Sequence, residues 1–226
     1  MTRAAVLTLV VLVAAGALRG DAPRPAPAAA GAYANDFQKS QAGEVPKDLF
    51  VLNGSFSVRE EAGNKFLELA GHPIDTFGLL FGAETGYATA DVRGRVQATS
   101  RGKLFPEFGL GSNDAGGYKV WLLPGQSALE LRRGESPVPK ARVPYKWESG
   151  SWTWFRLRVT PAGEGKWKVE AKAWPATAKE PENWPLTLEE TQIPPPGRAS
   201  AWGQPYADTP IRFDDLSVTP VTAEKR

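Results

Sequence analysis

The chain has 226 residues, of which 42% are hydrophobic and 10% aromatic, and this is enough apolar material for one sizeable core. Its 27 basic and 25 acidic residues leave a net charge of +2 and are dispersed along the chain, which argues against nucleic acid and anionic membranes as partners. The absence of cysteine excludes disulfides, thiolate chemistry and lipid attachment at a lipobox cysteine. Because 23 glycines and 20 prolines interrupt the chain, short strands are favoured over long helices.

The N-terminal segment predicts export. Residues 1–20 contain Arg3 and then an apolar run shorter than a membrane-spanning helix, which is typical of a signal peptide. We therefore expect a secreted or periplasmic protein without membrane contact after cleavage, with an uncleaved anchor as the alternative. Residues 21–34 are rich in proline and alanine and predict an extended linker. A folded domain is predicted over 35–221, followed by a disordered tail over 222–226.

Strands are predicted wherever apolar and polar residues alternate. The clearest alternation runs over 88–98, where small or apolar residues occupy every second position. Further strands are predicted at 55–58, 65–69, 77–81, 105–110, 118–123, 129–132, 154–159, 168–174, 186–192 and 211–219. Short strands separated by turn residues, without helical crossovers, predict an all-β fold made of a two-sheet antiparallel jelly-roll sandwich.

Two of these strands are expected to form a hairpin. With a turn at 161–165, Trp154 lies opposite Lys172 and Arg156 lies opposite Glu170. These even-numbered side chains then share a solvent-facing surface, while their odd-numbered neighbours in the first strand pack inside.

Tryptophan and charged residues are expected to gather on the polar sheet surface. An indole ring covers the C–H face of a sugar, and charged side chains around it hydrogen-bond the hydroxyl groups. The predicted carbohydrate-binding residues are Arg93, Arg95, Trp121, Arg132, Trp154, Arg156, Glu170 and Trp174. In the alternative interpretation, each tryptophan packs in the core or at its rim, and Arg156 and Glu170 form an ordinary exposed ion pair.

Four segments carry a resemblance to a known superfamily. The sequence is Ser-Trp-Thr-Trp-Phe-Arg-Leu-Arg-Val at 151–159, Val-Glu-Ala-Lys-Ala-Trp-Pro at 169–175, Glu-Pro-Glu-Asn-Trp at 180–184 and Ile-Arg-Phe-Asp-Asp-Leu-Ser-Val at 211–218. These segments resemble the C-terminal half of concanavalin A-like lectin/glucanase jelly rolls, including laminin-G-like modules. The resemblance implies two curved antiparallel sheets with a concave face open to ligands. That fold hosts lectins, glycosidases, carbohydrate-binding modules and protein-binding modules, so it does not decide the function.

Catalytic signatures are missing from the sequence. Laminarinase-type glycosidases of this superfamily carry a Glu-x-Asp-x-x-Glu pattern that places carboxylates on one strand face, and the chain has no such pattern. The acidic pairs Glu60-Glu61, Glu189-Glu190 and Asp214-Asp215 are adjacent in sequence and would point to opposite faces. The single histidine, His72, is expected in a turn, and without cysteine it leaves transition-metal sites short of ligands.

These observations predict a non-catalytic, lectin-like β-sandwich, a monomer whose partner is a glycan or polysaccharide. Two alternatives remain open: a glycan-active hydrolase of the concanavalin A-like or keto-disaccharide hydrolase-like type, and a structural or protein-binding jelly roll. No cofactor is expected; the alternative is a structural calcium ion held by carboxylates such as Asp36, Asp214 or Asp215 with backbone oxygens.

Overall fold

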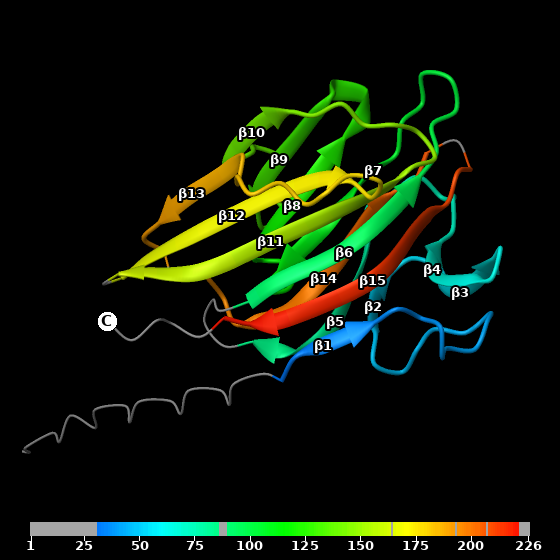
Figure 1. Cartoon of the computed structure of the whole chain (residues 1–226), viewed down its shortest axis with the longest axis horizontal. Helices are drawn as coiled ribbons and strands as arrows, with labels where there is room; N and C mark the ends of the chain where they lie inside the picture. The colour runs from blue at the N-terminus through cyan, green and yellow to red at the C-terminus, as the bar shows by residue number, and fades with distance from the viewer. Residues whose placement is uncertain (1–30, 86–89, 164, 193, 207, 222–226) are drawn as a thin grey trace, which may run out of the picture.

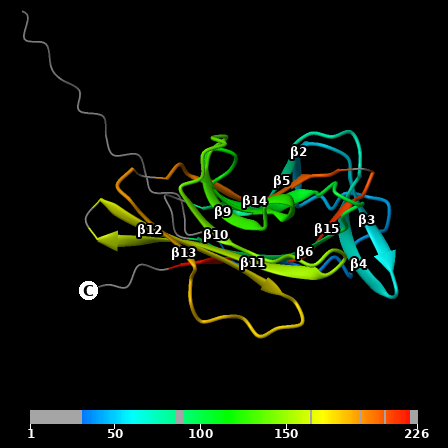
Figure 2. The ribbon, with the colours of Figure 1, turned by 90° about the horizontal axis from the view of Figure 1, so that it is seen from above.

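The computed structural model describes residues 31–85, 90–163, 165–192, 194–206 and 208–221. These residues form two antiparallel sheets that pack face to face (Figures 1 and 2). The elements are β1 (Tyr33–Asn35), β2 (Phe50–Asn53), β3 (Phe56–Glu61), β4 (Asn64–Leu69), β5 (Phe77–Thr85), β6 (Ala90–Ala98), β7 (Glu107–Ser112), β8 (Tyr118–Leu123), the 3-10 helix η1 (Pro124–Gln126), β9 (Ala128–Arg133), β10 (Ala141–Pro144), β11 (Trp152–Gly163), β12 (Lys166–Pro175), β13 (Leu186–Glu190), β14 (Gly197–Gln204) and β15 (Ile211–Pro220). The predicted all-β, two-sheet jelly-roll sandwich is confirmed.

Each sheet combines runs of consecutive strands with strands that are distant in sequence. Sheet A has the order β13-β12-β11-β6-β15-β4-β3, with β1 also paired to β15. Sheet B has the order β10-β9-β8-β7-β14-β5-β2. Figure 2, which views the sandwich from above, shows these as two separate layers. Each sheet therefore has an inner face toward the core and an outer face toward solvent.

The core lies between the two inner faces. From Trp152 to Val159 in β11, the odd-numbered residues are buried and the even-numbered ones are partly exposed, as predicted from the alternation. Phe155 of this strand meets Phe108 of sheet B edge to face, with ring centroids 5.9 Å apart. The tryptophan and arginine residues of β11 occupy its even-numbered positions, and their side chains therefore lie on the outer face of sheet A.

The register of the β11–β12 hairpin differs from the prediction. Trp154 lies opposite Trp174, and Arg156 lies opposite Lys172. The predicted pairs are wrong by two residues, because the turn is centred one residue later than expected. Gly163 and Gly165 both have positive φ angles and allow the tight turn at this later position. A two-residue shift leaves every side chain on the face that was predicted for it.

The N-terminal boundary also differs from the prediction. Tyr33 and Ala34, assigned to the linker by the sequence, belong to β1 and pair with Val218 and Ser217. The predicted signal peptide at 1–20 and the predicted tail lie outside the described residues. Among the described residues, no helix has the length and hydropathy that crossing a membrane requires.

Candidate functional site

The eight predicted carbohydrate-binding residues lie on two opposite surfaces. Six of them are on the outer face of sheet A, on β6, β11 and β12. These are Arg93, Arg95, Trp154, Arg156, Glu170 and Trp174. Trp121 and Arg132 instead lie on β8 and β9, on the outer face of sheet B. The prediction of one shared surface is therefore wrong, because alternation within a strand does not tell which sheet the strand joins.

On sheet A, arginine side chains cover the indole rings. Trp154 and Trp174 stack with ring centroids 6.2 Å apart and planes 18° apart. The guanidinium of Arg93 lies 4.3 Å from the centroid of the Trp154 ring, and that of Arg95 lies 4.9 Å from the centroid of the Trp152 ring. Trp174 is only 4% exposed. The ring faces engaged in these contacts are closed to a ligand.

The charged groups of the same face are paired with one another. Arg156 contacts Asp91 at 2.6 Å and Glu180 at 2.7 Å. Lys172 contacts Glu180 at 2.8 Å and donates a hydrogen bond to the carbonyl of Pro181 at 2.6 Å. Hydrogen bonding to Asp91 raises the pKa of Arg156 despite the opposing effect of burial. This network leaves Arg156 and Lys172 engaged with protein carboxylates.

The carboxylates of the network have lowered pKa values. Burial alone would raise the pKa of Glu170, but hydrogen bonds from Lys168 and Arg158 outweigh it and lower the pKa. The pKa of Glu180 is lowered in the same way, with Lys172 as the largest contributor against burial. Both carboxylates are therefore ionised and used within the protein.

The segment between β12 and β13, residues 176–185, crosses the outside of sheet A (Figure 2). It brings Glu180 into the ion-pair network and lays Trp184 over it. The Trp184 ring centroid lies 4.2 Å from the ammonium of Lys172 and 4.5 Å from the guanidinium of Arg158. The contacts of this segment make the outer face of β11 and β12 a packed layer.

Two depressions remain beside that layer. One of about 870 Å³ is bordered by Arg93 and Trp154, and another of about 360 Å³ is bordered by Arg95 and Trp152. In both, the arginine at the border is the one that lies over the neighbouring indole. A sugar would have to displace this arginine to reach that ring face.

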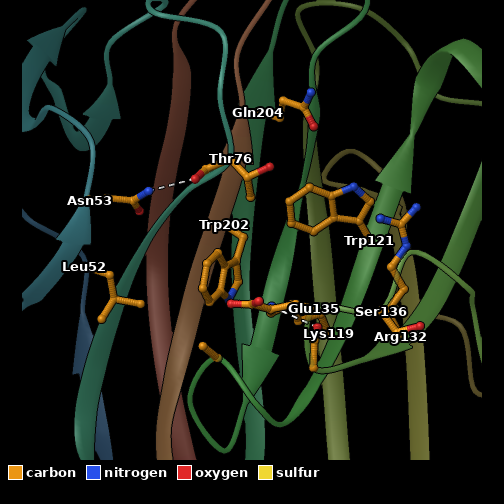
Figure 3. A pocket seen from close by; sticks show the side chains of 12 residues that line it. Leu52, Asn53, Thr76, Lys119, Trp121, Arg132, Glu135, Ser136, Trp202 and Gln204 are labelled. Carbon is orange, nitrogen blue, oxygen red and sulfur yellow. Dashed lines mark hydrogen bonds between the residues drawn. The ribbon is translucent and has the colours of Figure 1, made fainter.

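A cleft of about 520 Å³ crosses the outer face of sheet B (Figure 3). Strands β2, β8, β9 and β14 contribute to it, together with the residues just before β5 and just after β9. The side chains that line it include Asn53, Lys119, Trp121, Arg132, Trp202 and Gln204. Two tryptophans, two cations and two amides thus converge on one concave surface.

A row of cross-strand partners forms the floor of this cleft. It runs from Trp121 on β8 through Gly109 on β7 and Trp202 on β14 to Gly78 on β5. An added β-carbon at Gly78 would lie 2.5 Å from the Trp202 ring, so glycine is what gives the ring room to lie on the sheet. Trp121 and Trp202 pack with Leu123 in a hydrophobic cluster separate from the main core. The result is an aromatic surface on the outside of the sandwich.

The two indole rings are held in place by hydrogen bonds within the sheet. Nε1 of Trp121 donates to Glu107 at 3.0 Å, and Nε1 of Trp202 donates to Ser200 at 2.7 Å. Trp121 is 4% exposed and Trp202 is 7% exposed. Because the rings are already fixed, a ligand that contacts them does not have to order them.

Charged side chains border the aromatic floor. Nε of Arg132 donates to Glu130 at 2.7 Å, and the same carboxylate pairs with Arg142 at 3.1 Å. The ammonium of Lys119 lies 4.0 Å from the centroid of the Trp202 ring. Burial lowers the pKa of Lys119. An apolar floor with fixed donors at its edge is an arrangement suited to a sugar ring and its hydroxyl groups.

Trp202 was absent from the predicted site because β14 was not predicted as a strand. Its inward positions hold only alanine and glycine, and three prolines precede it, so the segment has the composition of a loop. The available signal was the alternation of Ser200 and Trp202 with these small residues.

The carboxylates considered as calcium ligands have other partners. Asp214 is fully buried and accepts a bond from Arg95 at 2.7 Å, while Asp215 contacts the same guanidinium at 2.8 Å. Burial raises the pKa of Asp214, with the hydrogen bond from Asn64 opposing it. No group of three or more His, Asp or Glu side chains that could hold a metal occurs in the part of the chain that the structure describes.

No protein-family model and no curated protein matches the sequence. Solved structures match it in fold at low sequence identity. The apo Crh5 transglycosylase superposes with a TM-score of 0.58 at 12% identity, over 86% of this chain and 86% of that one. The carbohydrate-binding module CBM66 from Bacillus subtilis gives a TM-score of 0.53 at 9% identity, over 76% of this chain and 94% of that one. The exoplasmic/lumenal domain of VIP36, solved with Ca²⁺ and Man3GlcNAc, gives 0.52 at 7% identity, over 81% and 88%. At these identities the likeness concerns the fold alone.

Proposed function

We propose that the chain is a secreted or periplasmic, non-catalytic carbohydrate-binding β-sandwich of the concanavalin A-like lectin/glucanase superfamily. The glycan lies in the cleft on the outer face of sheet B. The observation that carries this proposal is the floor formed by Trp121 and Trp202, which is fixed before any ligand arrives and bordered by hydrogen-bonding side chains. The similar folds of a carbohydrate-binding module and of a glycan-bound lumenal domain support it.

The sheet B cleft is favoured over the outer face of sheet A. On sheet A the cations bind protein carboxylates and cover indole rings, so a ligand would have to break those contacts first. In the cleft, the Nε1 atoms of Trp121 and Trp202 are bonded at the ring edges, and the ammonium of Lys119, which lies over the Trp202 ring, is bonded to a backbone carbonyl instead of a carboxylate. A sugar can therefore approach without first displacing an ion pair.

A binding role is favoured over hydrolysis by the residues of β7. Its outward positions are Glu107, Gly109 and Gly111, so this strand supplies one carboxylate to the outer face where a catalytic pair would need two. Glu107 accepts the indole N–H of Trp121, and Glu130 on β9 is 2% exposed and held by two arginines. Both carboxylates serve to position neighbouring side chains.

The proposal is tested by measuring retention of the protein on immobilised polysaccharides and on a glycan array. We expect the native chain to bind, Trp202→Ala to weaken binding by at least about tenfold, and the matched variant Trp154→Ala on sheet A to leave it unchanged. Near-ultraviolet circular dichroism establishes that both variants are folded.

Three outcomes contradict the proposal. Absence of binding to every glycan tested would remove the carbohydrate-binding function. Loss of binding in Trp154→Ala with full binding in Trp202→Ala would move the site to sheet A. Release of reducing ends from a bound polysaccharide would show that the chain is a hydrolase and contradict the non-catalytic assignment.

A further inference from the structure

Lys119 is a buried cation at the base of the cleft on sheet B. It lies on β8 and is only 7% exposed. Its ammonium donates one hydrogen bond, to the carbonyl of Gly134 at 3.2 Å, and lies over the Trp202 ring (Figure 3). Within the described ranges, no carboxylate oxygen comes within 4.0 Å of this ammonium.

The partners of the Lys119 ammonium differ from those of another buried lysine. Lys172 on sheet A is 3% exposed, and its ammonium contacts the carboxylate of Glu180 at 2.8 Å. The fold thus pairs one buried ammonium with a carboxylate and gives the other only a carbonyl and an aromatic ring. A desolvated charge is costly unless it is paired. Binding of an anion beside Lys119 would therefore offset a desolvation cost that the fold itself leaves uncompensated.

A second cation beside Lys119 adds electrostatic repulsion to the cost of burying its ammonium. Arg132 lies directly opposite Lys119 in the β8–β9 register, and like charges in opposed positions repel. Glu130 neutralises Arg132 through two contacts of 2.6 and 2.7 Å. Burial lowers the pKa of Lys119 and outweighs the opposing effect of Glu135, which is exposed at the rim of the cleft, while Arg132 acts in the same direction as burial. Of the two cations, Lys119 is therefore the one whose charge is less neutralised by protein carboxylates, and an anion that enters the cleft would bind it more readily than Arg132.

We infer that the cleft is selective for an acidic glycan, in which a sugar ring carries an anionic group, a carboxylate or a sulfate ester, that binds the ammonium of Lys119. This inference rests on the proposed function, because it assigns a ligand class to the same cleft. In this arrangement the sugar ring lies on the floor of Trp121 and Trp202. Its anionic substituent accepts hydrogen bonds from the N–H groups of the Lys119 ammonium that are not bonded to the carbonyl of Gly134.

The test compares acidic polysaccharides with neutral forms of the same chains. Polygalacturonate, alginate and glucuronan serve as carboxylate probes, each beside its carboxyl-reduced form, and a sulfated galactan beside its desulfated form serves as the sulfate probe. Affinity electrophoresis with the full chain is expected to give binding at least about tenfold tighter to the acidic member of one pair. Whether the preference falls among the uronates or on the sulfated galactan identifies the anion.

The variants separate charge from structure. Lys119→Met keeps the aliphatic stem and is expected to abolish the preference for the acidic member, so that the two members of a pair bind with equal affinity. Lys119→Arg restores the charge and is expected to recover the preference. Lys172→Met, which removes a buried ammonium from the opposite face, is the matched control and should leave the preference intact.

The outcomes distinguish this inference from the proposed function. Equal binding to acidic and neutral members, or an unchanged preference in folded Lys119→Met, overturns the acidic-glycan inference and leaves the carbohydrate-binding function standing. Absence of binding to any polysaccharide overturns both.

Discussion

The indole ring of Trp202 lies across the backbone of Gly78 on the neighbouring strand, so close that a β-carbon at Gly78 would fall 2.5 Å from the ring. The backbone of Gly78 is itself held in place, because its N–H donates a hydrogen bond to Oδ1 of Asn53 at 3.0 Å. The orientation of the principal aromatic residue of the cleft therefore depends on the absence of a side chain on another strand.

Gly78→Ala is accordingly predicted to impair binding although it touches no ligand. The added methyl group must push the Trp202 ring away from the sheet, because three atoms of that ring would lie within 3.0 Å of it. We expect glycan affinity to fall by about tenfold and the tryptophan fluorescence spectrum to shift. Gly31→Ala is the control, since a β-carbon at Gly31 meets no atom within 4 Å. Unchanged affinity in Gly78→Ala would show that the ring position is not important for binding.

Trp174→Ala is predicted to lower stability rather than glycan binding. The ring is 4% exposed and stacks on Trp154, so its removal leaves a cavity on the outer face of sheet A. We expect the free energy of unfolding to fall by about 3 kcal/mol in urea denaturation, while affinity measured well below the melting temperature stays unchanged. A variant of native stability with lost affinity would contradict this assignment and favour a ligand on sheet A.

The sequence predicted the all-β sandwich, and which face of β11 is buried, because local alternation decides which side chains of a strand are buried. The odd-numbered residues of β11 face the core as predicted, and this held even though the turn after Val159 shifted the pairing with β12 by two residues. Which strands become neighbours is a different matter. β6 lies between β11 and β15, a contact between segments far apart in the chain that no local pattern encodes.

The same distinction explains what could be predicted of the site. Trp121 and Arg132 were identified as outward-facing residues, and both line the cleft. Their assignment to the surface of Trp154 failed because it required knowledge of sheet membership. Trp202 was missed because its strand is built from small residues, and its partner Gly78 became recognisable only once β14 and β5 were seen to be adjacent.

Arg156→Met is predicted to destabilise the domain without affecting binding. The substitution leaves Asp91 and Glu180 without the guanidinium that now contacts both. We expect a loss of about 1 to 3 kcal/mol in the free energy of unfolding, measured in urea. The matched control is Arg59→Met, whose side chain is 59% exposed and contacts Glu68 at 3.6 Å, and which should cost no more than about 1 kcal/mol. Equal losses in the two variants would mean that the sheet A network contributes no more than an ordinary surface pair.

The pH dependence of stability is predicted to carry the signature of Glu180. Its pKa in the folded chain lies below the ordinary 4.5, because hydrogen bonds from Lys172 and Arg156 outweigh burial. The folded state therefore binds this proton more weakly than the unfolded state. The contribution of Glu180 to the free energy of unfolding is complete above about pH 4.5 and is lost as the pH falls through the folded-state pKa.

Thermal melts at about pH 6 and about pH 3.5 measure this loss. Glu180→Gln lacks the titrating group, so its melting temperature should fall less on acidification than that of the native chain. Asp214→Asn should behave in the opposite way. Burial raises the pKa of Asp214, so protonation at low pH favours the folded state, and the variant loses that compensation and falls further. Identical pH profiles for the native chain and both variants would exclude these two carboxylates as determinants of acid stability.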